Sequence, residues 1–190
     1  GTDANTATSA WFINVTDNSS LDGGLGPDGT LGTTVFARIV GNGMDIVDVM
    51  TKLPTLNLDA NLLPAAPVVT MDKSIGAEDL INVISVSRFN GTLADYEASL
   101  NEDGSSSTPN LTDVVCVETN LGEFCIQMFT EDAPQTVANF LNYVRNGNFN
   151  NTFIHRSVPG FVIQAGGFLF DNAQGPVAIT KNAPVVNEFK

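Results

Sequence analysis

The sequence predicts a mainly β protein with two helices and one stretch of irregular structure. Short runs of alternating apolar and polar residues recur along the chain, and turns rich in Gly, Asn, Ser, Asp and Pro separate them. Two segments, 45–53 and 134–146, instead carry apolar residues at helical spacing. The chain has 190 residues, of which 43% are hydrophobic, which is enough for one full core or for one core plus a small appendage.

The composition also excludes several classes of partner. The formal net charge is −13, and the sequence has no basic patch to follow a phosphate backbone or an anionic membrane surface. We therefore expect no nucleic-acid partner and no membrane partner. The single histidine, His155, and the two cysteines, Cys116 and Cys125, lack the usual spacing of a zinc site. No metal and no other cofactor is expected.

The first part of the chain predicts two strands and a helix. Residues 11–16 form a short apolar run, and residues 33–40 alternate well enough to form a second strand. A turn-rich stretch, 17–32, lies between them. Asp45 is placed to cap the following helix, which Pro54 ends.

Three further segments complete this half of the chain. Residues 55–79 are rich in Leu, Pro and Asp and are predicted to be an insertion with little regular structure. Residues 80–88 have an extended pattern and are predicted to form a strand. Residues 90–112 include a polar, Gly-, Ser- and Pro-containing stretch and are predicted to be a linker.

A hairpin follows the linker, with strands at 113–118 and 123–129 and a tight turn at 120–122. The predicted register sets Cys116 opposite Cys125 on one face. A cross-strand disulfide and a pair of free thiols both fit this arrangement. The core residues predicted on the other face are Val115, Val117, Phe124, Ile126 and Met128.

The clearest helix begins near Pro134, after Asp132, and ends before Gly147. Its apolar residues form one stripe, which suits a helix that plugs the open end of a sheet or barrel. The stripe consists of residues 133, 137, 140, 141 and 144.

Residues 153–167, FIHRSVPGFVIQAGG, place Arg156 in a mostly apolar run. Burying a cation is costly, so Arg156 taken alone is compatible with a side chain that reaches water or pairs with a carboxylate. The run as a whole resembles the active-site strand of the cyclophilins, the prolyl cis/trans isomerases. The matched positions are Phe153, His155, Arg156, Pro159, Phe161, Gln164, Gly166 and Gly167.

The resemblance covers most of the chain, but its two halves stand in reversed order. Residues 113–190 resemble the N-terminal half of a cyclophilin, including its Ala-Pro-x-Thr-Val-x-Asn-Phe helix at 133–140. Residues 1–54 and the last strand, 80–89, resemble the C-terminal half. This half is matched by Asn5, Ser9, Trp11, Phe12, Ile13, Val35-Phe36-Ala37 and Gly43-Met44-Asp45. The resemblance implies a closed antiparallel cyclophilin-like β-barrel with two capping helices, extended by the insertion 55–79 and the linker 90–112.

The reversed order leaves three explanations open. The chain is a circular permutant whose old termini are bridged by 90–112, a fragment across two tandem domains, or a sequence with segments missing or reordered. Permutation is physically reasonable because chain ends often lie close together. In the family, a further core strand lies between the segment that resembles residues 186–189 and the segment that resembles residues 5–13. We do not recognise that strand in this sequence. Something else must then close the sheet, and another chain could supply it by swapping.

The resemblance implies an enzyme, a peptidyl-prolyl cis/trans isomerase that assists protein folding as a chaperone. The peptide bond resists rotation with a barrier of ~18–20 kcal/mol. A donor to the prolyl nitrogen weakens the resonance only as the bond twists, so it lowers the barrier selectively. Arg156 is implied as that donor. The other implied roles are an apolar proline floor from Phe161, Phe12 and Leu21, a grip on the substrate backbone by Gln164, and a structural place for His155.

Departures from the family pattern predict weaker function. Ala10 stands at a substrate-binding position where the family usually has a glutamine, and Ser20 stands where many members have a tryptophan associated with cyclosporin binding. We expect lowered activity on proline-containing peptides and unfolded proteins, and weak or no cyclosporin binding. The alternative functions are a proline-peptide-binding module with little or no turnover and an extracellular structural β protein. The acidity and the possible disulfide favour a periplasmic or secreted location.

Overall fold

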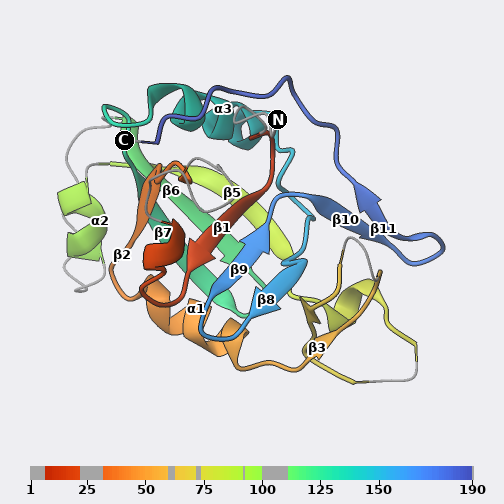
Figure 1. The fold of residues 1–190 in the computed structure, drawn as a ribbon. Helices are drawn as coiled ribbons and strands as arrows, with labels where there is room; N and C mark the ends of the chain where they lie inside the picture. The colour runs from red at the N-terminus through yellow and green to blue at the C-terminus, as the bar shows by residue number, and fades with distance from the viewer. Residues whose placement is uncertain are drawn as a thin grey trace.

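A computed structural model of the chain shows a mainly β fold with helices around two principal sheets (Figure 1). The residues that the structure describes are 7–21, 32–59, 63–71, 74–91, 93–99 and 111–189. The predicted mainly β class is confirmed, but the described residues contain three α-helices rather than two. None of the helices in these ranges is long and apolar enough to cross a membrane.

The larger sheet is antiparallel and contains the predicted hairpin. Its strand order is β2 (Ala37–Val40), β7 (Gly122–Met128), β6 (Leu111–Thr119) and β5 (Val83–Asn90). The hairpin register is as predicted, with Cys116 opposite Cys125. Val115, Val117 and Phe124 are fully buried on the core face. Alternation alone therefore fixed which side of this hairpin faces inward.

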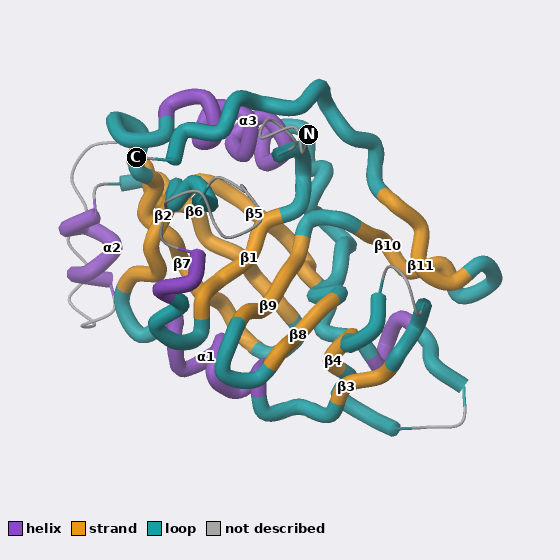
Figure 2. The backbone as a smooth tube through the Cα atoms, in the orientation of Figure 1, coloured by secondary structure: helices purple, strands orange, loops and turns teal. Residues whose placement is uncertain are grey.

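The smaller principal sheet has the order β1 (Trp11–Asn14), β9 (Val162–Ala165) and β8 (Arg156–Val158) (Figure 2). The run 153–167 is therefore two antiparallel strands rather than one. Gly160 makes the reversal possible because its φ of 68° is in the left-handed region that glycine adopts without strain. The Phe161 N–H closes the turn by donating to the Val158 carbonyl oxygen at 3.0 Å.

The two sheets meet along a seam of main-chain hydrogen bonds between the start of β5 and the segment before β8. The Val83 N–H donates to the Thr152 carbonyl oxygen at 2.8 Å, and the Ile154 N–H donates to the Ile81 carbonyl oxygen at 2.9 Å. On the opposite side, β1 pairs with β9 alone and β2 with β7 alone within the described ranges. The strand pairing of these residues therefore shows no closed barrel.

One hydrophobic cluster draws on both halves of the chain. Trp11 of β1 lies edge-on to Phe124 of β7 and to Phe140, with ring centroids 6.5 and 6.2 Å apart. Val47 and Ile81 are fully buried in the same cluster. Segments that are distant in sequence therefore share a single core.

Two helices lie where the sequence predicts helices. The helix α3 (Pro134–Arg145) buries Val137, Phe140, Tyr143 and Val144. The helix α1 (Gly43–Thr51) starts two residues earlier than expected, so the prediction of Asp45 as its cap is wrong. Asp45 lies inside the first turn, where its N–H donates to the Asn42 carbonyl oxygen at 3.0 Å.

The C-terminal segment runs along α3 and ties the halves together (Figure 1). The Glu188 carboxylate accepts hydrogen bonds from the N–H groups of Gln135 and Thr136 at 3.0 and 2.8 Å, so it caps the start of α3. Thr34 bonds to Asn187 and Glu188 in the same region. The strand β2 begins at residue 37 rather than at 33, and the Thr34 side chain before it is held by the C-terminal segment.

The predicted linker 90–112 contains an unpredicted helix, and most of its remaining residues lie outside the described ranges. This helix, α2 (Leu93–Ser99), follows directly after β5. Tyr96 is buried, and its ring meets Phe89 edge-on at 5.4 Å. The helix forms because Leu93 and Tyr96, three residues apart, cover apolar residues on the outer face of the larger sheet.

The insertion 55–79 is also more ordered than predicted. Its regular elements are β3 (Thr55–Leu56), β4 (Ala66–Pro67) and the 3-10 helix η2 (Ala77–Asp79). The Gly76 N–H and the Thr70 hydroxyl both donate to the Asp79 carboxylate and hold its pKa below the usual value. We call residues 55–79 the extension. Its residues Leu63 and Val68 are fully buried and pack with Phe153 in a small apolar core that is separate from the main one.

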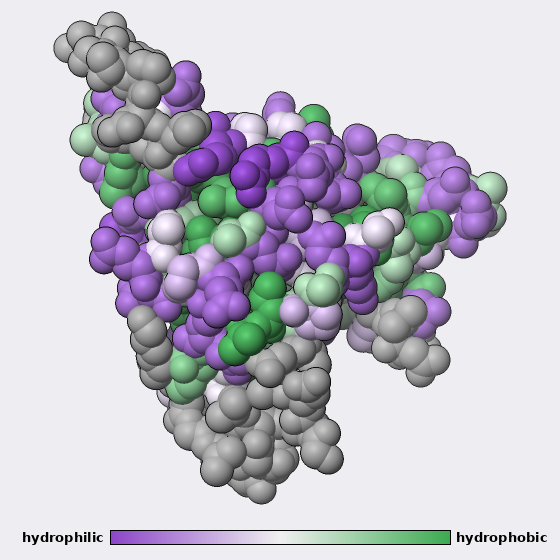
Figure 3. Space-filling model, turned by 90° about the horizontal axis from the view of Figure 1, so that it is seen from above, coloured by the Kyte–Doolittle hydropathy of each residue, from purple (hydrophilic) through white to green (hydrophobic). Residues whose placement is uncertain are grey.

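A second hairpin, β10 (Phe168–Asp171) and β11 (Gly175–Ala178), projects beside the extension (Figure 1). Phe168 and Phe170 of β10 pack against the apolar core of the extension. Seen from above, the coloured part of the surface is mostly hydrophilic with scattered apolar residues (Figure 3).

Candidate active site

The smaller sheet brings three of the predicted site residues into one row. Arg156 of β8 is opposite Gln164 of β9, and Gln164 is in turn opposite Phe12 of β1. Residues directly opposite each other in antiparallel strands point to the same face of the sheet. The Arg156 Nη1 group donates a hydrogen bond to Gln164 Oε1 at 3.0 Å. We call Phe12, Gln164 and Arg156 the arginine row.

Among the described residues, no carboxylate forms a salt bridge with Arg156. The one salt bridge among the described residues joins Arg88 to Asp113, at 3.9 Å, on the other sheet. Gln164 is the hydrogen-bond partner that the structure gives Arg156. A guanidinium carries five N–H donors, so Arg156 keeps donors for another acceptor.

The strand that carries Arg156 is held on both edges. One edge pairs with β9, and on the other the Ser157 N–H donates to the Ala65 carbonyl oxygen of the extension at 2.8 Å. Ser157 is buried, whereas Arg156 is half-buried. The extension therefore holds the edge of β8 that faces away from β9, and the Arg156 side chain stays partly accessible.

His155 is buried next to this strand in an aromatic setting. Its ring meets Phe168 and Phe153 edge-on, with centroids 5.1 and 6.5 Å away. Burial, and secondarily the positive charge of Arg156, lower the pKa of His155 to about 4. The imidazole is therefore neutral near pH 7.

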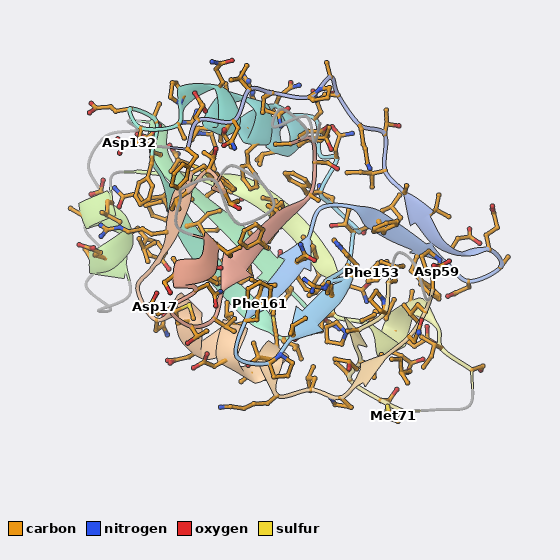
Figure 4. All side chains as sticks on the ribbon, in the orientation of Figure 1. Asp17, Asp59, Met71, Asp132, Phe153 and Phe161 are labelled. Carbon is orange, nitrogen blue, oxygen red and sulfur yellow. A yellow bond between two sulfur atoms is a disulfide. The ribbon has the colours of Figure 1, made fainter. Side chains whose placement is uncertain are left out.

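Phe161 lies in the turn between β8 and β9 and is half-buried. Its carbonyl oxygen accepts from the Val15 N–H at 3.0 Å and from Asn18 Nδ2 at 2.8 Å, which ties the turn to the end of β1. Figure 4 shows Phe161 near β1 and Phe153 toward the extension and β10. Phe161 thus lies at the end of the sheet that carries the arginine row.

The remaining two predicted residues flank β1. Ala10 is exposed and immediately precedes the strand, where it presents only a methyl group. Leu21 ends the 3-10 helix η1 (Ser19–Leu21) and is half-buried, and its N–H donates to the Asn18 carbonyl oxygen at 2.8 Å. The Leu21 carbonyl oxygen accepts from the Thr33 N–H at 3.4 Å, and its place in a proline floor stays a prediction. The side chain of Ser20 lies outside the described part.

A glycine after β9 allows close packing next to the row. Gly166 has a φ of 77°, and a Cβ there would lie 2.5 Å from the Ser9 carbonyl oxygen and 2.8 Å from the Trp11 ring. The segment before β1 can therefore run directly over this turn.

The supporting residues of the site are not indicated by the sequence motifs. Ala65 bonds to β8, and Phe168 packs on His155. The apolar residues Leu63, Ala66 and Val68 were the available signal that the extension has a core.

Sequence comparisons agree with this geometry. The family described as cyclophilin type peptidyl-prolyl cis-trans isomerase/CLD matches residues 1–72 and 114–190. Peptidyl-prolyl cis-trans isomerase B of Escherichia coli is 51% identical over 55 residues, which are 29% of this chain and 34% of that protein. A peptidyl-prolyl cis-trans isomerase of Acinetobacter baylyi is 39% identical over 75 residues, 40% of this chain and 38% of that protein.

A plant relative is similar over a comparable length. Peptidyl-prolyl cis-trans isomerase CYP71 of Arabidopsis thaliana is 38% identical over 82 residues, 43% of this chain and 13% of that protein. The chain thus spans well under two thirds of each of these relatives. No solved structure matches the chain significantly. The family match covers more than half of the chain, and the chain therefore belongs to the cyclophilin-type peptidyl-prolyl cis-trans isomerase family.

Proposed function

We propose that this chain catalyses the cis/trans isomerisation of X-Pro bonds, with Arg156 as hydrogen-bond donor to the prolyl nitrogen. The observation that carries the proposal is the arginine row. Its guanidinium is bonded to Gln164, which is opposite Phe12 on the next strand, and has no carboxylate partner in the described part of the chain. A guanidinium paired with a carboxylate would have its charge and its donors already engaged. In the arginine row, the charge and the remaining N–H donors of Arg156 are available to a substrate.

The chemistry needs only a well-placed donor. The prolyl nitrogen is a poor acceptor in the planar amide and becomes a good one when the bond twists and the nitrogen pyramidalises. A hydrogen bond from Arg156 at that stage stabilises the transition state more than the ground state. Because arginine stays protonated at all relevant pH values, the donor is always available.

Gln164 and the aromatic residues would orient the substrate. Gln164 Oε1 holds one arm of the guanidinium, which leaves the Gln164 amide N–H groups for a substrate carbonyl. Phe12 and Phe161 lie at the same sheet and are both half-buried, so they are available as an apolar floor for the proline ring. We assign Leu21 to this floor and His155 to a structural role on the resemblance.

We also propose that the chain is a circularly permuted, closed cyclophilin barrel. Two observations support this order. The halves share one core, and the Val185 N–H donates to the Ala7 carbonyl oxygen at 3.0 Å, so the two outer segments lie together. A monomer in sedimentation analysis, with one cooperative unfolding transition, is expected. An obligate dimer would instead indicate that a second chain closes the sheet.

The substrates we propose are proline-containing peptides and unfolded proteins in a periplasmic or secreted setting, with weak cyclosporin binding. A second candidate is a proline-peptide-binding module with little turnover. The exposed methyl of Ala10 favours it, because no amide is present there to hold the peptide.

A proline-limited peptide isomerisation assay tests the proposal. Arg156→Ala should lower kcat/KM by about 100-fold, the usual cost of removing one transition-state donor. The matched control is Arg88→Ala, which removes an arginine from the other sheet and should leave the rate within about twofold of the original.

Two outcomes contradict the proposal in different ways. A wild-type protein that binds prolyl peptides but shows no rate above the uncatalysed reaction would establish the binding module instead. A fast wild-type rate that Arg156→Ala leaves unchanged would establish an isomerase that does not use this guanidinium.

A further inference from the structure

The outer face of the β6–β7 hairpin carries two facing pairs of metal-binding side chains. Cys116 is opposite Cys125, and Glu118 is opposite Glu123, the next pair on the same face. The cysteines form a disulfide in the structure. The sequence reads Cys-x-Glu on one strand and Glu-x-Cys on the other. We call these four residues the hairpin face.

Three donor atoms of the hairpin face already lie close together. One carboxylate oxygen of Glu123 and the sulfur atoms of Cys116 and Cys125 are all within 4.8 Å of one another. The Cys125 sulfur is 3.9 Å from Glu123 Oε1. The spacing of Cys and His alone indicates no metal site, whereas the Glu123 carboxylate adds a third donor atom beside the two sulfur atoms.

The glutamate pair adds negative charge on the same face as the sulfur atoms. Like charges directly opposite each other in an antiparallel pair are destabilising. Glu118 and Glu123 are both exposed and directly opposite. The Ser85 hydroxyl donates to Glu118 at 3.0 Å, whereas the Glu123 carboxylate lies with the sulfur atoms. Glu123, rather than Glu118, is therefore placed to be a ligand.

We propose that reduction of the Cys116–Cys125 disulfide converts the hairpin face into a binding site for a thiophilic divalent cation such as Zn²⁺. The ligands are the two cysteine sulfur atoms and the Glu123 carboxylate, with water in the fourth position. Two thiolates and one carboxylate in a tetrahedral arrangement are a donor set that Zn²⁺ accepts. The net charge of −13 further favours cation binding.

The redox step balances with a dithiol as reductant. The dithiol attacks the disulfide and transfers two electrons and two protons, which leaves two thiols on the protein and a cyclic disulfide on the reductant. Binding of the cation then displaces the two thiol protons, because the thiolate is the metal ligand. In the oxidised protein the sulfur atoms are bonded to each other and carry no charge.

The helix α2 controls access to the sulfur atoms. Cys125 is fully buried and Cys116 is 7% exposed, and Tyr96 and Leu93 of α2 pack over them. Burial, and secondarily the negative charge of Glu123, raise the pKa of Tyr96. A seven-residue helix is marginal by itself, so a reductant reaches the disulfide when α2 leaves the sheet.

The test uses Cd²⁺ as a spectroscopic probe and Zn²⁺ as a competitor. Protein reduced with a dithiol and freed of reductant should bind one Cd²⁺ per chain, with a thiolate-to-metal charge-transfer band that Zn²⁺ removes. Oxidised protein should show no band. Bound Zn²⁺ should also protect both cysteines from alkylation.

Two glutamate variants make the ligand assignment specific. Glu123→Gln should weaken Cd²⁺ binding to reduced protein by at least about 10-fold. The matched control Glu118→Gln changes the opposite glutamate and should shift the affinity by less than about threefold. Equal effects of the two variants would overturn the assignment of Glu123.

Folding is checked separately, because reduction removes a cross-link. If reduced protein stays folded by circular dichroism and shows neither band nor protection, the proposal is wrong. If reduced protein unfolds, Zn²⁺ must restore the folded spectrum, since the site exists only in the folded chain. Failure of Zn²⁺ to do so also overturns the proposal. The site is on a different sheet from Arg156, so these results do not depend on isomerase activity.

Discussion

The arginine row and the hairpin face are built in the same way but differ in how accessible their central side chains are. Each consists of side chains that antiparallel pairing sets directly opposite one another. In the row, Arg156 and Gln164 share one hydrogen bond and stay half-buried. In the hairpin face, the cysteines are joined covalently and buried beneath α2. Register decides which side chains meet, and what covers them decides whether they remain available.

The largest effect we expect is the pH dependence of stability caused by His155, which is next to Arg156 of the arginine row. His155 has a folded-state pKa of about 4 against an ordinary value of 6.5. Between these pH values the unfolded chain binds a proton that the folded chain does not. The free energy of unfolding should therefore fall as the pH falls through this window, by about 3 kcal/mol in total.

Urea unfolding at several pH values measures this effect, with His155→Gln as the comparison. The carboxylates contribute equally to both proteins, so the variant should lose the histidine part of the slope. Parallel pH profiles would mean that His155 is not held neutral. The profile of Cys116→Ser/Cys125→Ser should keep the slope, since the hairpin face contains no histidine.

The second effect belongs to the hairpin face. Replacing both cysteines in Cys116→Ser/Cys125→Ser should lower the free energy of unfolding by roughly 2–3 kcal/mol, as expected for a short closed loop. Isomerase activity should stay within about twofold. Denaturant unfolding and the peptide assay measure the two quantities. A tenfold loss of activity in folded protein would show that the hairpin face and the arginine row are coupled, which would contradict their treatment as independent regions.

The third effect concerns Gln164, the residue that is hydrogen-bonded to Arg156. Gln164→Ala removes the hydrogen bond that orients Arg156 and should lower kcat/KM by about 10-fold. Gln164→Glu places a carboxylate opposite Arg156 and should cost at least as much at pH 7, because the ion pair engages the guanidinium. Full activity of Gln164→Glu would show that an open guanidinium is not required.

The smallest effect lies outside both regions. Glu188→Gln weakens the cap of α3 and removes a negative charge from the start of the helix. The free energy of unfolding should fall by about 1 kcal/mol. Activity and thiol chemistry should not change. Thermal unfolding measures the loss, and an unchanged midpoint would mean that the cap contributes nothing to stability.

Local patterns were sufficient for part of the fold. Alternation over 113–129 predicted the register that sets Cys116 opposite Cys125, and helical spacing predicted α3. Both depend on neighbours within a few residues, which the sequence states directly. The resemblance supplied Arg156 and Gln164 as a pair, although the reversal at Gly160 that brings them together was not predicted.

Long-range contacts decided the remainder. The helix α2 exists where a linker was expected because Tyr96 finds apolar cover on a sheet that other strands build. The extension is ordered because Leu63 and Val68 meet Phe153. Glu188 caps α3 from about 50 residues away in sequence. The apolar residues themselves are visible in the sequence, but the segments that they pack against are decided by the tertiary fold.

The sequence by itself determined the faces of the hairpin, the main helix and the chemistry that residue 156 offers. Only the tertiary structure decided which groups are open to a ligand and which are covered. The physical reason is that periodicity records the direction of a side chain from its own strand, whereas burial depends on distant segments that arrive when the chain folds.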